Sequence, residues 1–266
     1  KKAGFSTGRG DEGGFVNPFK NVRQAVELVL KAIEEAGYTA GRHVFLAFDG
    51  AFSEIFGKEL HEEEADPKDR TYHLEGRRQT ALEVVAYWEK LVSDYPAIIS
   101  IEDGMGERDA KGWKALTEKL GWKVQLVLDD YVCTNPGLIK AAIRASIGNS
   151  SLIKLNQVGT VTETIEAMQI TRDAGRSNVL SHRSGEVSEE DFIGHLAVHP
   201  LVDQIKAGSS GRNENYNALW VIEQDYAQMH DGVLPPYRGL DAFPRAVRDG
   251  IMARSRGDAP QSKRQG

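Results

Sequence analysis

Short apolar runs alternate with longer amphipathic stretches along almost the whole chain. Most of the runs are continuously apolar and do not alternate strictly with polar residues, which is typical of parallel strands covered on both faces. The pattern predicts seven strands, at residues 5–9, 44–48, 98–101, 124–128, 151–155, 178–181 and 202–205.

The stretches between these runs have the spacing of apolar residues and the capping residues that are typical of helices. Val22, Val26, Val29 and Ile33 fall on one helical face, and Gly37 follows them as a C-terminal cap. Repeated strand–helix units predict a parallel α/β sheet, either open and doubly wound or closed into an eight-stranded TIM-like (β/α) barrel. The seven strands are one short of a closed barrel, and the first begins close to the start of the chain. For a barrel we therefore expect the first strand to be absent from this chain.

Composition and charge narrow the class of protein further. The 266 residues carry 33 Lys and Arg against 39 Asp and Glu, a formal net charge of −6, with no basic stripe that would favour nucleic acid. No apolar run approaches the roughly 20 residues of a membrane span, and the first residues have no signal-peptide pattern. Cys133 is the single cysteine, which excludes an internal disulfide and suits a reducing compartment. We expect a cytoplasmic protein with one domain over residues 1–253, incomplete at its N-terminus, and a disordered polar tail at 254–266.

Acidic residues follow three successive predicted strands. Asp49, Glu102 and Asp129 each come directly after an apolar run. Because the carboxyl ends of parallel strands meet on one face, the three carboxylates would point at one place and repel one another. A divalent cation removes that repulsion, and an all-oxygen ligand set suits Mg²⁺ better than Zn²⁺. The alternative is that each carboxylate caps the following helix or is solvated in a loop.

Basic and titratable residues accompany the next strands. Lys154 interrupts an otherwise apolar run. In a barrel mouth it would act as a general base if its pKa were lowered, and at the sheet periphery its amine would reach water. His182, Arg183 and Ser184 follow the sixth run and offer an imidazole, an anion fork and a hydroxyl for a phosphate or carboxylate. Lys206 follows the last run.

These two sets of charges indicate a class of reaction. With metal-binding carboxylates on one side and basic groups on the other, we expect an anionic ligand that has an acidic C–H beside a carboxylate. Lys154 is then the candidate base. Glu12, in a glycine-rich turn next to the first run, is the candidate acid for a leaving group.

Seven segments, in order, resemble the enolase (phosphopyruvate hydratase) family, from the first residues to about Gln224. The segments are ST at 6–7 with GDEGGF at 10–15, FD at 48–49 with SE at 53–54, SIED at 100–103, DD at 129–130 with TNP at 134–136, KLNQVGTVTE at 154–163, SHRSGE at 181–186, and QIK at 204–206.

The resemblance implies a Mg²⁺-dependent lyase that interconverts 2-phosphoglycerate and phosphoenolpyruvate. It implies a TIM-like barrel whose separate N-terminal domain and first strand are absent from this chain, a homodimer, and a second Mg²⁺ that arrives with the substrate. The implied site residues are Asp49, Glu102 and Asp129 as Mg²⁺ ligands, Lys154 as the base at C2, Glu12 for departure of the C3 hydroxide, and His182, Arg183, Ser184 and Lys206 as contacts of the phosphorylated carboxylate substrate.

Local departures from the family pattern keep two alternatives open. Gly104-Met105-Gly106 stands where many enolases have Pro-Phe, residues 50–52 are Gly-Ala-Phe where small aliphatics are usual, and the segment at 212–217 is shorter. These changes favour a paralogue that acts on a phosphonate analogue, such as carboxyphosphonoenolpyruvate synthase. The alternative of another class is a non-catalytic binding or structural protein that reuses the fold.

Overall fold

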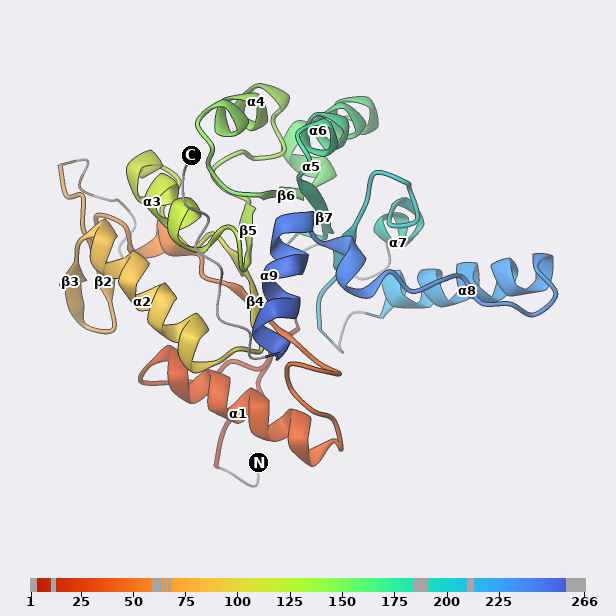
Figure 1. Cartoon of the computed structure of the whole chain (residues 1–266), viewed down its shortest axis with the longest axis horizontal. Coiled ribbons are helices and arrows are strands. Elements are labelled where there is room, and N and C mark those ends of the chain that lie inside the picture. The colour runs from red at the N-terminus through yellow and green to blue at the C-terminus, as the bar shows by residue number, and fades with distance from the viewer. Residues whose placement is uncertain are drawn as a thin grey trace.

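Six parallel strands form one curled sheet in the computed structural model, which describes residues 4–10, 13–58, 64, 66, 68–183, 191–209 and 213–256 (Figure 1). The strands are β1 (Leu46–Asp49), β4 (Ile98–Glu102), β5 (Gln125–Leu128), β6 (Ser150–Ile153), β7 (Ser177–Ser181) and β8 (Gln204–Lys206). Their order across the sheet is β1-β4-β5-β6-β7-β8, which follows the chain without a reversal. This order excludes the doubly wound alternative, and the curl gives a half-barrel of the TIM-like α/β type.

Helices connect the strands and cover the outside of the sheet (Figure 1). They are α1 (Val22–Glu35), α2 (Ala81–Asp94), α3 (Ala110–Leu120), α4 (Pro136–Arg144), α5 (Leu155–Val158), α6 (Val161–Asp173), α7 (Phe192–Leu196), α8 (Glu214–Met229) and α9 (Arg245–Arg256), with 3₁₀ turns η1 (Phe52–Ile55) and η2 (Gly239–Ala242). Capping fixes several starts: Thr80 and Glu83 form a capping box before α2, and Asn135 accepts two backbone N–H groups before α4.

Six of the seven predicted strands are confirmed within a few residues, and the first is wrong. Residues 5–9 do not join the sheet, and Arg9 instead forms an isolated antiparallel bridge with Phe15. The Val16 N–H donates to the Gly8 carbonyl at 3.0 Å, and the Gly10 N–H donates to the Gly14 carbonyl at 2.9 Å. Residues 8–10 thus pair with residues 14–16 and not with a strand of the sheet.

An antiparallel hairpin that the sequence pattern does not predict lies beside the sheet. It consists of β2 (Tyr72–Leu74) and β3 (Arg77–Gln79). Tyr72 is fully buried, and its ring centroid lies 4.8 Å from that of Phe56 and 5.9 Å from that of Phe52. Trp88 completes this aromatic cluster and donates its indole N–H to the Gly104 carbonyl at 2.8 Å.

Two departures from the resemblance are part of this aromatic cluster. Phe52 is 4% exposed, and Met105 is fully buried between Gly104 and Gly106. A Cβ atom on Gly106 would lie 2.8 Å from Phe56 Cγ, so glycine is what allows the loop to approach this ring. Phe52 and the loop at 104–106 are therefore part of the buried core around this cluster.

The amino ends of the strands are covered by α9 (Figure 1). Val247 and Ile251 are almost fully buried and pack against Ile99 of β4, together with Phe45 just before β1. Burial of these side chains makes α9 the floor of the half-barrel, on the opposite side from the carboxyl ends of the strands.

The last turns of α9 are anchored by Arg254. Its guanidinium donates to the Ile98 carbonyl at 3.3 Å and to the Lys123 carbonyl at 2.9 Å. The predicted tail starts at Arg254, whereas the helix continues to Arg256. Residues 257–266 of that predicted tail lie outside the described residues.

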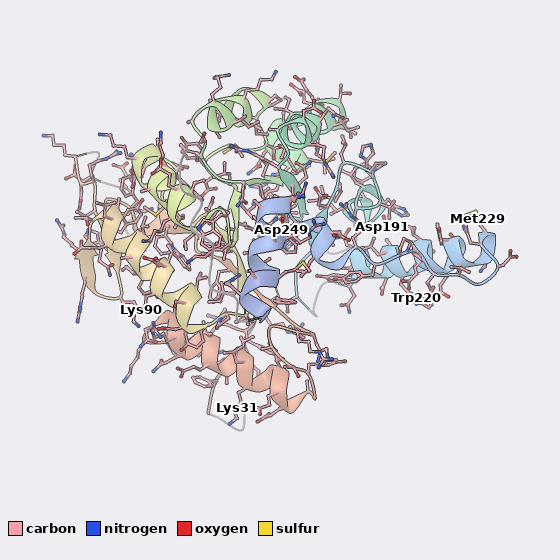
Figure 2. The ribbon with its side chains drawn as sticks, in the orientation of Figure 1. Lys31, Lys90, Asp191, Trp220, Met229 and Asp249 are labelled. Carbon is pink, nitrogen blue, oxygen red and sulfur yellow. The ribbon has the colours of Figure 1, made fainter. Side chains whose placement is uncertain are left out.

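Helix α8 extends away from the half-barrel, with Trp220 and Met229 along it (Figure 2). These two side chains are 63% and 74% exposed. Among the helices in the described ranges, none combines the length and the apolar character needed to cross a membrane.

Candidate active site

Three carboxylates lie at the carboxyl ends of neighbouring strands, although among the described residues their oxygens do not all come within 4.8 Å of one another. Asp49 ends β1, Glu102 ends β4 as its partner in register, and Asp129 directly follows β5. Glu102 and Asp129 are each 6% exposed. Burial and the charge of Asp49, with a smaller contribution from Asp129, raise the pKa of Glu102 to about 8 against the attraction of Lys206. The three predicted metal ligands therefore form one electrostatic group.

The ammonium group of Lys206 lies between two of these carboxylates. Its Nζ is 2.7 Å from Asp49 Oδ2 and 2.9 Å from Glu102 Oε1. Burial lowers the pKa of Lys206, but the two carboxylates outweigh burial, so the pKa lies above its ordinary value. In the described geometry Lys206 is therefore a cation that partly neutralises the group.

Lys154 pairs with the third carboxylate. Its Nζ is 2.6 Å from Asp129 Oδ2, and Gln157 donates its amide N–H to Asp129 Oδ1 at 2.9 Å. Burial lowers the pKa of Lys154, but the hydrogen bond and the charge of Asp129 raise it above the ordinary value. A general base must be neutral, so this ion pair has to be loosened before the Lys154 amine can accept a proton.

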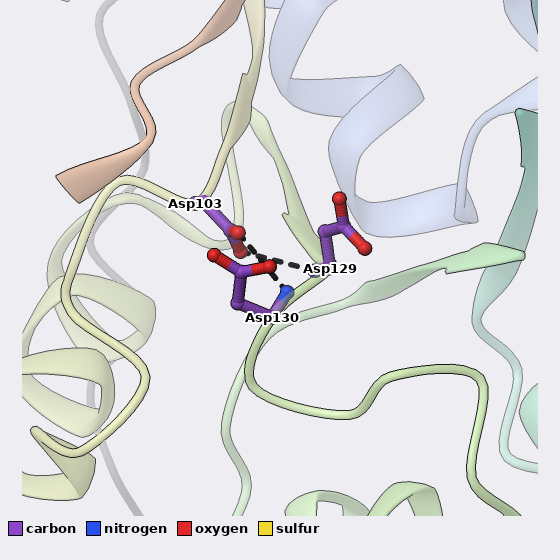
Figure 3. A group of neighbouring side chains, drawn as sticks. All are labelled: Asp103, Asp129 and Asp130. Carbon is purple, nitrogen blue, oxygen red and sulfur yellow. Dashed lines mark hydrogen bonds between the residues drawn. The ribbon is translucent and has the colours of Figure 1, made fainter. Parts of the chain in front are cut away.

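A second group of carboxylates shares Asp129 with the first. Asp103, Asp129 and Asp130 each have an oxygen within 4.8 Å of the others, close enough to hold one ion (Figure 3). Asp103 also accepts the backbone N–H groups of Asp129 and Asp130, both at 3.0 Å. Burial raises the pKa of Asp103 to about 8 against these two hydrogen bonds. Asp103 is not among the ligands predicted from the sequence, although its position next to Glu102 was a signal for it.

A cavity of about 510 Å³ opens beside Lys206 and is large enough for a small ligand. Asp49, Glu102 and His182 line it with Lys206, and polar side chains that include Gln125 form another part of its wall. His182 is 2% exposed. The structure thus brings two predicted substrate contacts, His182 and Lys206, next to the carboxylate group.

The remaining predicted site residues lie elsewhere or outside the described ranges. Arg183 lines a separate cavity of about 320 Å³, with Asn156 and Phe192 in its wall. Glu12 and Ser184 fall among the residues that the structure does not describe, so their roles stay predictions.

Comparison with families of known proteins gives a match over most of the chain. The model of the family described as "Enolase, C-terminal TIM barrel domain" matches residues 1–235. The matched range contains all six strands of the sheet and every predicted site residue, whereas η2 and α9 lie beyond it.

Proposed function

Since the chain belongs to the enolase family, as a C-terminal TIM barrel domain, we propose that it carries the site of a Mg²⁺-dependent lyase that interconverts 2-phosphoglycerate and phosphoenolpyruvate. The observation that supports this proposal best is the arrangement of Asp49, Glu102 and Asp129 around two lysine ammonium groups.

The donor set fits Mg²⁺. All three candidate ligands are carboxylates on neighbouring strands, and the raised pKa of Glu102 reflects burial and repulsion that a cation would relieve. Asp49, Glu102 and Asp129 would hold the ion after drawing closer together, since among the described carboxylates only Asp103, Asp129 and Asp130 have oxygens within 4.8 Å of one another. When bound, Mg²⁺ would supply positive charge beside the substrate carboxylate and so make the neighbouring C–H more acidic.

The residues of the chain then divide the reaction between them. Lys154 takes the proton from C2 as the C2–C3 double bond forms, and the C3 hydroxyl leaves as water with a proton from Glu12. His182, Arg183 and Ser184 contact the phosphorylated substrate, with Arg183 and Ser184 on its phosphate. Lys206 lies near the substrate carboxylate.

The paralogue with a phosphonate substrate is the weaker proposal. The loop at 104–106 and Phe52, which suggested an altered site, are buried in the aromatic cluster. Their departure from the family pattern therefore does not argue for a different substrate. The shorter segment at 212–217 still favours this alternative, because Tyr216 lines the cavity beside Lys206.

The test is Mg²⁺-dependent conversion of 2-phosphoglycerate by the full-length gene product, measured by the ultraviolet absorbance of phosphoenolpyruvate. Turnover should fall by about a hundred- to ten-thousandfold in Lys154→Ala, because the general base is lost. The matched control is Lys140→Ala, since Lys140 pairs with Glu166 on the surface and its side chain is 52% exposed.

Each alternative has its own outcome in this assay. Mg²⁺ binding without turnover of 2-phosphoglycerate would favour the paralogue and call for phosphonate substrates. A chain that Mg²⁺ neither binds nor stabilises would favour the non-catalytic protein. Near-normal turnover in Lys154→Ala would show that the assigned base is wrong.

A further inference from the structure

A closed series of hydrogen bonds connects the backbone of Lys154 to its own side chain. The Lys154 N–H donates to Thr134 Oγ1 at 2.9 Å, and the Thr134 hydroxyl donates to Gln157 Oε1 at 2.6 Å. Gln157 Nε2 donates to Asp129 Oδ1 at 2.9 Å, and Asp129 Oδ2 accepts from Lys154 Nζ at 2.6 Å. The loop after β5, the N-cap of α5 and α5 itself therefore meet in one ring around the candidate base.

The direction of every bond in this ring is determined. The Thr134 oxygen accepts from the Lys154 N–H, which can only donate, and the Thr134 hydroxyl proton is directed at Gln157 Oε1. The carboxamide of Gln157 must then turn its NH₂ group toward Asp129. Both oxygens of Asp129 therefore accept hydrogen bonds, which favours the ionised carboxylate in one orientation.

Thr134 is held in an unusual conformation that places its hydroxyl in the ring. It is fully buried and has φ +53°, in the left-handed region that β-branched residues rarely adopt. Its neighbour Cys133 also has a positive φ, and the Cys133 N–H donates to the Asp129 carbonyl at 2.8 Å. Backbone strain of this kind persists where surrounding contacts determine it, and it is concentrated at functional sites.

We propose that Thr134 and Gln157 are positioning residues that hold the Asp129 carboxylate and the Lys154 amine in one arrangement, and so set the affinity of this site for Mg²⁺ as well as its turnover. The turnover part rests on the proposed function. The affinity part depends only on Asp129 as a ligand. Partners that orient a metal ligand typically change metal affinity or activity by about 10- to 100-fold when they are lost.

Two isosteric variants test the ring. Gln157→Met removes the amide at similar length, and Thr134→Val removes the hydroxyl while keeping the branched shape. For each we expect Mg²⁺ to bind about tenfold more weakly by titration calorimetry and kcat to fall about tenfold or more. The KM for 2-phosphoglycerate should change less than threefold, because neither side chain is expected to contact the substrate.

Controls separate positioning from a general loss of structure. Gln169→Met removes an exposed amide that bonds only Asp173 among the described contacts, and it should leave Mg²⁺ affinity and kcat unchanged. Thr134→Ser keeps the hydroxyl and should recover most of what Thr134→Val loses. Circular dichroism and the unfolding midpoint without Mg²⁺ report whether each variant is folded.

The outcomes distinguish the two proposals. Weaker Mg²⁺ binding in Gln157→Met, in a protein without enolase turnover, would support the ring and contradict the proposed reaction. Wild-type Mg²⁺ affinity and kcat in a folded Gln157→Met would overturn the ring whatever the reaction is. A full-length protein that binds no Mg²⁺ would overturn both.

Discussion

Asp49 and Lys206 end the two edge strands of the sheet, and their charged groups meet at 2.7 Å although the residues are 157 positions apart. All other strands of the sheet lie between β1 and β8, so the contact forms only because the sheet curls. The same ammonium group reaches Glu102, whose side chain is 7% exposed. One lysine thus joins the edges of the half-barrel and balances the buried carboxylate of Glu102.

Lys206→Met should lower the free energy of unfolding by about 1–3 kcal/mol in EDTA, because the buried Glu102 would lose its cation. Urea unfolding measures the difference. The control is Lys90→Met, since Lys90 pairs with Asp94 on the surface and its side chain is 71% exposed. That variant should change stability by less than about 0.5 kcal/mol. Equal effects of the two variants would contradict the special role of Lys206.

Gly250→Ala should destabilise the floor of the half-barrel by about 1–3 kcal/mol, despite the better helix propensity of alanine. The added Cβ would lie 2.4 Å from the Trp122 carbonyl oxygen and 2.8 Å from Lys123 Cα, and backbone atoms cannot move aside easily. Gly14→Ala is the control, because its Cβ would meet no atom within 4 Å. Thermal unfolding in which Gly250→Ala matched the wild type would show that α9 tolerates a wider separation.

Asp103→Asn should destabilise the chain by about 1–3 kcal/mol, because the new amide NH₂ would face a backbone N–H of Asp129 or Asp130 and leave it unpaired. Asp225→Asn on α8 makes the same substitution at an exposed position and should be nearly neutral. Chemical unfolding at pH 7 compares them. If Asp103→Asn were neutral in stability but weakened Mg²⁺ binding, Asp103 would be a metal ligand and not a backbone anchor.

Asp69 should make stability fall in acid. Hydrogen bonds from the Thr71 hydroxyl and N–H, at 2.6 and 2.8 Å, lower the pKa of Asp69 to about 2. Because the folded pKa lies below the ordinary value of 3.8, this carboxylate stabilises the fold above pH 4 and loses that contribution between about pH 4 and pH 2. Asp69→Asn should therefore cost about 1 kcal/mol at pH 7, since a charged acceptor is replaced by a neutral one. The free energies of unfolding of the wild type and of Asp69→Asn should converge near pH 2. A difference between them that stays constant with pH would contradict the assignment.

The sequence predicts the sheet and the place of the charges well because both follow from short-range pattern. An apolar run that ends in Asp49, Glu102 or Asp129 needs only the rule that parallel strands end on one face. The same reasoning fails for residues 5–9, since an apolar run does not reveal that a glycine turn will pair it with Phe15.

The ring around Lys154 could not be predicted in the same way. Thr134 and Gln157 reach each other because the loop after β5 adopts positive φ angles at Cys133 and Thr134, neither of which is glycine. Sequence patterns mark such angles mainly through glycine, so nothing in the pattern indicated this loop path. The aromatic cluster around Tyr72 was missed for a related reason, because its members are brought together only by the tertiary fold.

The contact of α9 with β4 has a consequence for synthesis of the chain. Ile99 is covered by Val247 and Ile251, which the ribosome adds about 150 residues later. Until Val247 and Ile251 have emerged, the amino ends of the strands are uncovered and expose apolar side chains such as Ile99. The residues of the carboxylate face have already been synthesised by then. We therefore expect binding of a chaperone that recognises apolar surface to decline sharply once α9 leaves the exit tunnel, because α9 then covers the floor of the half-barrel.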